Sequence, residues 1–184
     1  MIPSSYPPRI LALNERAGFL GYVVFEGPKQ LLDWGTRALP SSQSPRSESR
    51  RERIAALFAK SSPEVVVVLQ ARGKQDVSSR RMQSTTQLVM IEASARATPL
   101  TFMDRREVRA AFCIFGASNK YKRAAVLARI FPELLWKLPP TRMKWQSEPR
   151  AMLVFDALAA GFAYWQVHGC ADPSQGSSRK SAPA

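Results

Sequence analysis

The chain has 184 residues, of which 45% are hydrophobic, and its 27 lysines and arginines outnumber 14 acidic residues, giving a formal net charge of +13. This length and apolar content fit one domain with a sizeable core and exclude wholesale disorder. The excess of positive charge favours a polyanionic partner, nucleic acid ahead of an anionic membrane surface, over a solvated basic surface without a partner.

The first part of the chain predicts three strands joined by short turns. Residues 1–8 are rich in proline and predict a flexible arm. Apolar runs rich in β-branched residues predict strands at 10–14 and 19–26, and a third strand at 30–36 follows the Gly-Pro-Lys turn signal at 27–29. Short connections between successive strands indicate an antiparallel meander.

The middle of the chain alternates helices and strands. After a Ser-rich loop at 40–45, Ser49 and Glu52 have capping-box spacing and predict a helix that ends at Ser62. The valine run at 65–70 predicts a buried strand of a mostly parallel sheet. The next predicted elements are a polar loop at 72–79, a helix at 80–96 and a strand at 99–103.

The last part of the chain predicts mainly helices. Two helical pieces, at 105–115 and 119–134, are separated by Gly-Ala-Ser. Ser147 as N-cap and Pro149 at the first helical position predict a final helix to about residue 167. The expected organisation is a flexible arm at 1–8, one α/β domain at 9–168 and a disordered tail at 169–184.

The cysteine and histidine content argues against several classes of protein. Cys113 and Cys170 lie far apart without CxxC spacing, which excludes a disulfide framework and an ordinary zinc site and predicts a cytoplasmic protein. A catalytic triad would have to use the lone His168, which is more typical of a surface or capping residue. The start of the chain lacks the apolar region of a signal peptide, and the apolar stretch at 151–165 is too short for a membrane span.

Two buried strands are closed by uncharged amides. Asn14 ends the first apolar run, and Gln70 ends the valine-rich one. Ligands and catalytic groups of open α/β sheets lie at the carboxyl ends of strands. An acid at such a position can hold a metal ion, whereas this sequence has amides at both positions.

Four segments share their order and spacing with one known family. They are Ile10-Leu-Ala-Leu-Asn14 with Gly18 and Gly21-Tyr-Val-Val, then Val66-Val-Val-Leu-Gln70, then Arg106-Glu-Val-Arg109 with Gly116-Ala-Ser-Asn-Lys120, and finally Asp156-Ala-Leu-Ala-Ala160. Together they resemble the RuvC-type Holliday-junction resolvases of the ribonuclease H-like superfamily. The resemblance covers about residues 10–167 and implies a ribonuclease H-like mixed five-stranded sheet flanked by helices.

The resembled family cleaves DNA with four carboxylates, which together can hold two Mg²⁺ ions at a phosphodiester. The resemblance places these positions on Asn14, Gln70, Leu153 and Asp156, of which only Asp156 is an acid. We therefore expect a degenerate site with no intact catalytic set and no metal cofactor. Asp156 is expected to form a hydrogen bond with Asn14 or Gln70.

The alternatives to a degenerate site are an enzyme and a scaffold. A divergent, Mg²⁺-dependent endonuclease would require a rebuilt carboxylate site, for which Glu15, Glu148 and Asp156 are the candidates. A protein-interaction scaffold would use the basic surface to meet an acidic partner. Members of the family tend to dimerise, which makes a homodimer an option.

Basic residues gather on segments that the implied fold places around the former active site. We expect them to bind nucleic acid, DNA ahead of RNA, through phosphate contacts that depend on salt and carry little sequence specificity. Trp145 is the best candidate for base stacking, whereas Trp34, Trp136 and Trp165 are expected in the core or a lid. The arginines at 50, 51 and 53 are expected to form an ordinary solvated helix face. The expected nucleic-acid-binding residues are Arg72, Lys74, Arg80, Arg81, Arg105, Arg106, Arg109, Lys120, Lys122, Arg123, Lys144 and Trp145.

Overall fold

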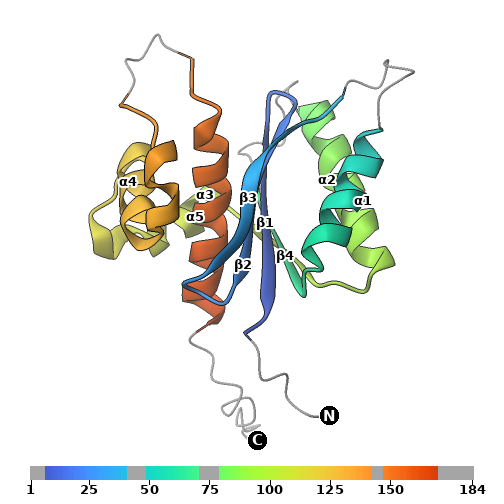
Figure 1. Cartoon of the computed structure of the whole chain (residues 1–184), viewed down its shortest axis with the longest axis horizontal. Coiled ribbons are helices and arrows are strands. Elements are labelled where there is room, and N and C mark those ends of the chain that lie inside the picture. The colour runs from blue at the N-terminus through green and yellow to red at the C-terminus, as the bar shows by residue number, and fades with distance from the viewer. Residues whose placement is uncertain (1–6, 41–48, 71–78, 142–146, 170–184) are drawn as a thin grey trace, which may run out of the picture.

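A computed structural model describes residues 7–40, 49–70, 79–141 and 147–169, with side chains from residue 85 onward in the third of these ranges. Five strands form one sheet in the order β3-β2-β1-β4-β5 (Figure 1). β1, β2 and β3 pair antiparallel, whereas β4 is parallel to β1 and β5 is parallel to β4. The predicted mixed five-stranded sheet is confirmed. The strands are β1 Arg9–Arg16, β2 Phe19–Glu26, β3 Leu31–Ala38, β4 Val65–Leu69 and β5 Leu100–Met103.

Helices cover both faces of this sheet (Figure 1). One face carries α1 Arg50–Ser61 and α2 Ser79–Ala95, and the other carries α3 Arg105–Ala111, α4 Lys120–Ile130 and α5 Ala151–His168. Two short 3₁₀ helices, η1 Cys113–Phe115 and η2 Pro132–Lys137, follow α3 and α4. Among the helices of these described ranges, none has the length and apolarity needed to cross a membrane.

Alternate residues of the strands build two separate cores. Ile10 and Ala12 of β1 face α5 and its neighbours, whereas Leu11 and Leu13 face α1 and α2. This division follows from the strand period, which sends successive side chains to opposite faces. Because both faces are buried, the central strands read as continuous apolar runs in the sequence.

α5 packs unusually close to the sheet because two glycines leave room for it. A Cβ at Gly21 of β2 would collide with the backbone of Leu153, and a Cβ at Gly161 of α5 would collide with the ring of Phe25. Leu153 is therefore enclosed between α5 and the sheet, with 1% of its surface exposed. This close packing positions the first turns of α5 beside the carboxyl ends of the central strands.

Local signals predicted one helix start correctly and another incorrectly. Ser49 caps α1, and Glu52 completes the capping box, as predicted. The prediction that Ser147 caps the last helix is wrong, because α5 begins at Ala151 after Arg150, which provides no side-chain cap. Glu148, two residues before Arg150, instead forms ion pairs with Arg16 and Lys120.

The first strand is longer than its apolar run predicted. β1 continues two residues past Asn14, because the hairpin pairs Glu15 with Leu20 and Arg16 with Phe19. Asn14 consequently lies inside β1, opposite Gly21, and the prediction that it ends the strand is wrong. Gln70 does follow the last residue of β4, as predicted, and its N–H donates to the Met103 carbonyl at 2.8 Å.

Candidate nucleic-acid interface

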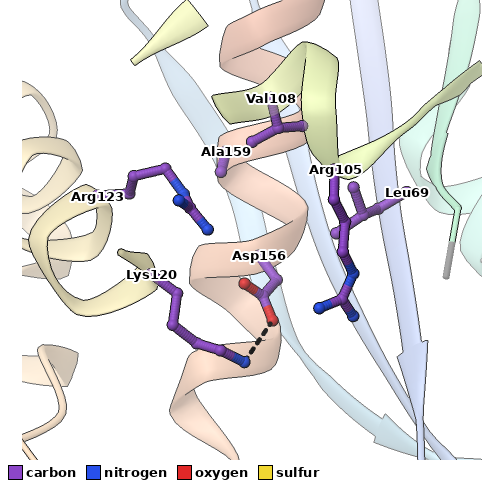
Figure 2. Close-up of a pocket in the computed structure, with 7 residues that line it drawn as sticks. All are labelled: Leu69, Arg105, Val108, Lys120, Arg123, Asp156 and Ala159. Carbon is purple, nitrogen blue, oxygen red and sulfur yellow. Dashed lines mark ion pairs between the residues drawn. The ribbon is translucent and has the colours of Figure 1, made fainter. Parts of the chain in front are cut away.

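A small pocket lies where β4 ends and where α3 and α4 begin, against the second turn of α5 (Figure 2). Its volume is about 20 Å³, which is room for roughly one water-sized group. Its lining consists of Leu69, Arg105, Val108, Lys120, Arg123, Asp156 and Ala159. The pocket therefore lies at the edge of the sheet where open α/β folds place their ligands.

Each of three helices contributes two lining residues at i, i+3 spacing, which puts both on one helix face. The pairs are Arg105 with Val108, Lys120 with Arg123, and Asp156 with Ala159. Short helix caps determine where two of these helices start. Asp104 accepts hydrogen bonds from the first turn of α3, and the side-chain Oδ1 of Asn119 accepts one from Lys122 N–H at 2.9 Å. Arg105 and Lys120 are thus the first residues of their helices.

An ion-pair network joins the pocket to the end of β1. Lys120 Nζ lies 3.8 Å from Asp156 Oδ2 and also pairs with Glu148, which in turn pairs with Arg16. The network ties together β1, the start of α4, the segment before α5 and α5 itself. The Asp156 side chain is only 13% exposed, so its charge interacts with these cations more strongly than it would in bulk water.

In this pocket, burial and the neighbouring charges shift the pKa values of two side chains in opposite directions. Burial raises the pKa of the Asp156 carboxyl above its ordinary value, while Lys120 and the nearby arginines act in the opposite direction. Burial likewise lowers the pKa of the Arg123 guanidinium, an effect that Asp156 opposes. Three cationic side chains face one carboxylate in the lining, so the pocket has an excess of positive charge (Figure 2). Chemically, it is suited to accept an anionic oxygen.

The four positions of the resembled family's acids are not equivalent in the structure. Asn14 and Leu153 are buried, Gln70 is exposed, and only Asp156 lines the pocket. The expected hydrogen bond from Asp156 to Asn14 or Gln70 does not occur among these described residues. Asp156 pairs with Lys120 instead, because α4 brings an ammonium group to the carboxylate.

The donors present do not fit a pair of divalent cations. In the described ranges, no three or more His, Cys, Asp or Glu side chains are arranged to hold a metal ion. The rebuilt site of Glu15, Glu148 and Asp156 is therefore not assembled, and the last two acids share the ammonium of Lys120. Amides and an enclosed leucine occupy the other family positions, whereas Mg²⁺ prefers carboxylate oxygens.

The structure brings together part of the predicted basic set. Arg105, Lys120 and Arg123 meet at the pocket, while Arg106, Arg109 and Lys122 are exposed on the first turns or outer face of the same helices. Arg72, Lys74, Lys144 and Trp145 lie outside the described residues, as do the side chains of Arg80 and Arg81.

Two side-chain roles in the network were not predicted: Arg16 as an ion-pair partner, and Glu148, expected only as an acid of a rebuilt metal site, as the residue that pairs with both Arg16 and Lys120. No local pattern announces them, because each depends on contacts between distant segments. The prediction that Trp136 lies in a core or lid is also wrong, since its side chain is 75% exposed. Trp34 and Trp165 are partly buried against the core, as predicted.

The arginines of α1 were expected to form a solvated face, and for two of them this is wrong. Arg50 donates to the Pro40 carbonyl and to Thr85 Oγ1, each at 3.1 Å, and Arg53 donates to the Ala38 carbonyl at 2.5 Å. These bonds form because α1 packs beside the end of β3 and beside α2. Arg51 is exposed and pairs with Glu92.

Comparison with known proteins gives similarity at the level of structure only. No protein-family model matches the sequence, and no curated protein matches it. The chain is similar to Thermus thermophilus RuvC in complex with a Holliday junction substrate, with 20% identity and a TM-score of 0.63, covering 88% of this chain and 96% of that one. It is also similar to the yeast mitochondrial Holliday junction resolvase Ydc2, with 13% identity and a TM-score of 0.53, covering 88% of this chain and 80% of that one. The predicted RuvC-like resolvase fold is confirmed.

Proposed function

We propose that this chain, which has a RuvC-like resolvase fold, binds branched or structured nucleic acid without cleaving it, DNA ahead of RNA. The observation that carries the proposal is the convergence of Arg105, Lys120 and Arg123 on one pocket with a single lining carboxylate. The solved complex of Thermus thermophilus RuvC contains a Holliday junction substrate, which supports a branched ligand for the shared fold.

The pocket suits one oxygen of a phosphate group, because its volume is about 20 Å³ and its lining is mainly cationic. Guanidinium groups donate planar, charge-assisted hydrogen bonds to phosphate oxygens, and the ammonium of Lys120 adds a compact positive charge. Exposed Arg106, Arg109 and Lys122 extend the positive surface around the pocket. Such contacts supply affinity that falls steeply with salt and depends little on base sequence.

The residues at the pocket support binding in preference to cleavage. A divalent ion lowers the pKa of a bound water and so generates a nucleophile, whereas an ammonium or guanidinium only neutralises the phosphate charge. The ammonium of Lys120 lies between Glu148 and Asp156, the acids best placed for a rebuilt site. Neither acid is therefore available to a metal without losing its ion pair.

The proposal is tested with a four-way DNA junction across a salt series, with Mg²⁺ or Mn²⁺ present. We expect affinity to fall linearly with salt on logarithmic axes and the junction to stay intact with either metal. Arg123→Gln should weaken binding about tenfold, since it removes one charge-assisted contact. Lys29→Gln is a matched control, because Lys29 is exposed in the β2–β3 turn, at the amino end of β1.

Three outcomes would overturn the proposal. Affinity that stays flat between low and moderate salt would contradict phosphate binding. Metal-dependent cleavage that disappears in Asp156→Asn would establish the endonuclease alternative instead. If an acidic protein is still captured after nuclease treatment, and the chain binds no junction, the scaffold alternative would be favoured.

Homodimer formation stays a prediction, and light scattering of the purified protein measures it.

A further inference from the structure

The 3₁₀ helix η2 displays a large aromatic ring to solvent. Trp136 is 75% exposed and its neighbour Leu135 is 59% exposed, whereas Phe131 and Leu134 are fully buried. Tryptophan is strongly buried on average in folded proteins, so an exposed ring needs an explanation. The turn that carries the ring is anchored in the core around α5, because Phe131, directly before η2, and Leu134, within it, are both buried there.

A cation lies over the same ring. Lys137 Nζ is 4.8 Å from the centroid of Trp136, within the range of a cation–π interaction. The ammonium therefore covers one face of the indole and supplies a positive charge beside the exposed ring. An exposed aromatic ring together with a cation is the combination that proteins use to bind single-stranded nucleic acid.

We infer that Trp136 and Lys137 form a stacking site for an unpaired nucleobase, with Lys137 contacting the adjoining phosphate. This inference rests on the proposed function, since it assumes that nucleic acid reaches the pocket. The charge of the surrounding surface favours a polyanion as the occupant. Lys122 and Arg129 are exposed on α4, and Glu133 is the one exposed acid within α4 and η2.

The stacking site and the phosphate pocket belong to one continuous unit. α4 begins with Lys120 at the pocket and ends at Ile130, directly before η2. Its 11 residues span about 16 Å, so a strand bound at the pocket needs only a few nucleotides to pass along α4. Phosphate contacts would hold the strand at one end of this unit, and a stacked base would hold it at the other.

Trp136→Ala tests the inference, with Leu135→Ala as the matched control from the same exposed turn. Fluorescence anisotropy would compare a labelled oligo(dT) with a blunt duplex of equal length. We expect Trp136→Ala to weaken oligo(dT) binding by about 5- to 100-fold and duplex binding by less than about twofold. Leu135→Ala should leave both affinities unchanged, and Trp136→Phe should retain most of the oligo(dT) affinity.

The outcomes separate this inference from the proposed function. If the unaltered protein binds neither oligo(dT) nor the junction, the proposed function fails. If it binds both, and Arg123→Gln weakens binding while Trp136→Ala does not, only the stacking inference fails. Equal losses of affinity for oligo(dT) and duplex in Trp136→Ala would also overturn the stacking inference. Unchanged nucleic-acid affinity together with lost self-association would overturn it too, and would assign the ring to a protein interface. Both alanine variants change exposed side chains, and circular dichroism confirms that they remain folded.

Discussion

The arginines of α1 and those around the pocket look alike in the sequence but have different roles in the structure. On α1, Arg50 and Arg53 donate to backbone carbonyls near the end of β3. At the pocket, Arg105, Lys120 and Arg123 line the cavity together with one carboxylate, Asp156, which leaves positive charge for a ligand. A run of basic residues therefore indicates a binding surface only where its side chains are not already hydrogen-bonded within the fold.

The largest effect is expected from the double variant Arg105→Ala/Arg123→Ala. Each guanidinium contributes a charge-assisted contact worth about 1.5–3 kcal/mol, so junction affinity should fall by about 100-fold or more. Arg51→Ala on α1 is the control and should change affinity by less than about twofold. Anisotropy titrations at one fixed salt concentration measure the junction affinities of both variants. Equal losses of affinity would contradict the distinction between the pocket arginines and those of α1.

Lys120→Met should lower the free energy of unfolding by about 1–3 kcal/mol at neutral pH, since it leaves Glu148 and Asp156 without their shared cation. The loss should shrink on acidification. Burial raises the pKa of Asp156, so the folded state holds its proton to a higher pH than the unfolded chain, and stability falls as pH rises from near 3.8 through the folded value. In Lys120→Met, stability should fall more steeply as pH rises, and urea unfolding at several pH values measures this.

Arg53→Ala tests the structural role of the α1 arginines. It removes the donor to the Ala38 carbonyl and should reduce the free energy of unfolding by about 1 kcal/mol while leaving junction affinity unchanged. Thermal unfolding and anisotropy measure the two quantities on the same preparation. A loss of affinity without a loss of stability would place α1 in the binding surface after all.

Asp156→Asn should give the smallest change in junction affinity, and the direction of that change is the most informative result. It removes the one carboxylate of the pocket lining, so junction affinity should rise by about threefold, as expected for a partly screened charge. The same change should flatten the fall of stability with pH, because the group with the raised pKa is gone. Weaker binding would mean that Asp156 orients Lys120 and Arg123 for the ligand.

Much of the fold could be predicted from local patterns. The strands at 10–14, 19–26 and 65–70 follow from apolar, β-branched runs, and α1 follows from the capping box of Ser49 and Glu52. Ser147 and Pro149 gave an equally good local signal for the last helix, and it was wrong. The difference is that Glu148 has ion-pair partners on β1 and α4, and these override a local preference.

The candidate site divides in the same way. Arg105, Lys120 and Arg123 were predicted because they lie on segments that the resembled fold places around the former active site, Arg105 after the fifth strand and Lys120 and Arg123 at the start of a helix. Trp136 was misjudged, because a 3₁₀ helix has three residues per turn, so the residues that face the core are Phe131 and Leu134. The arm at 1–8, the domain limits and the tail at 169–184 stay predictions.

Local patterns in the sequence account for the strands, most helix starts, the surplus of positive charge, and the amides and leucine at the family's acid positions. These are local properties, set by backbone preference, side-chain period and residue chemistry. Only the tertiary structure decided which cations converge on Asp156, which arginines serve the fold and which tryptophan reaches solvent. Those outcomes depend on contacts between segments far apart in the chain, such as the ion pair of Lys120 on α4 with Asp156 on α5 and the bonds of α1 to the end of β3.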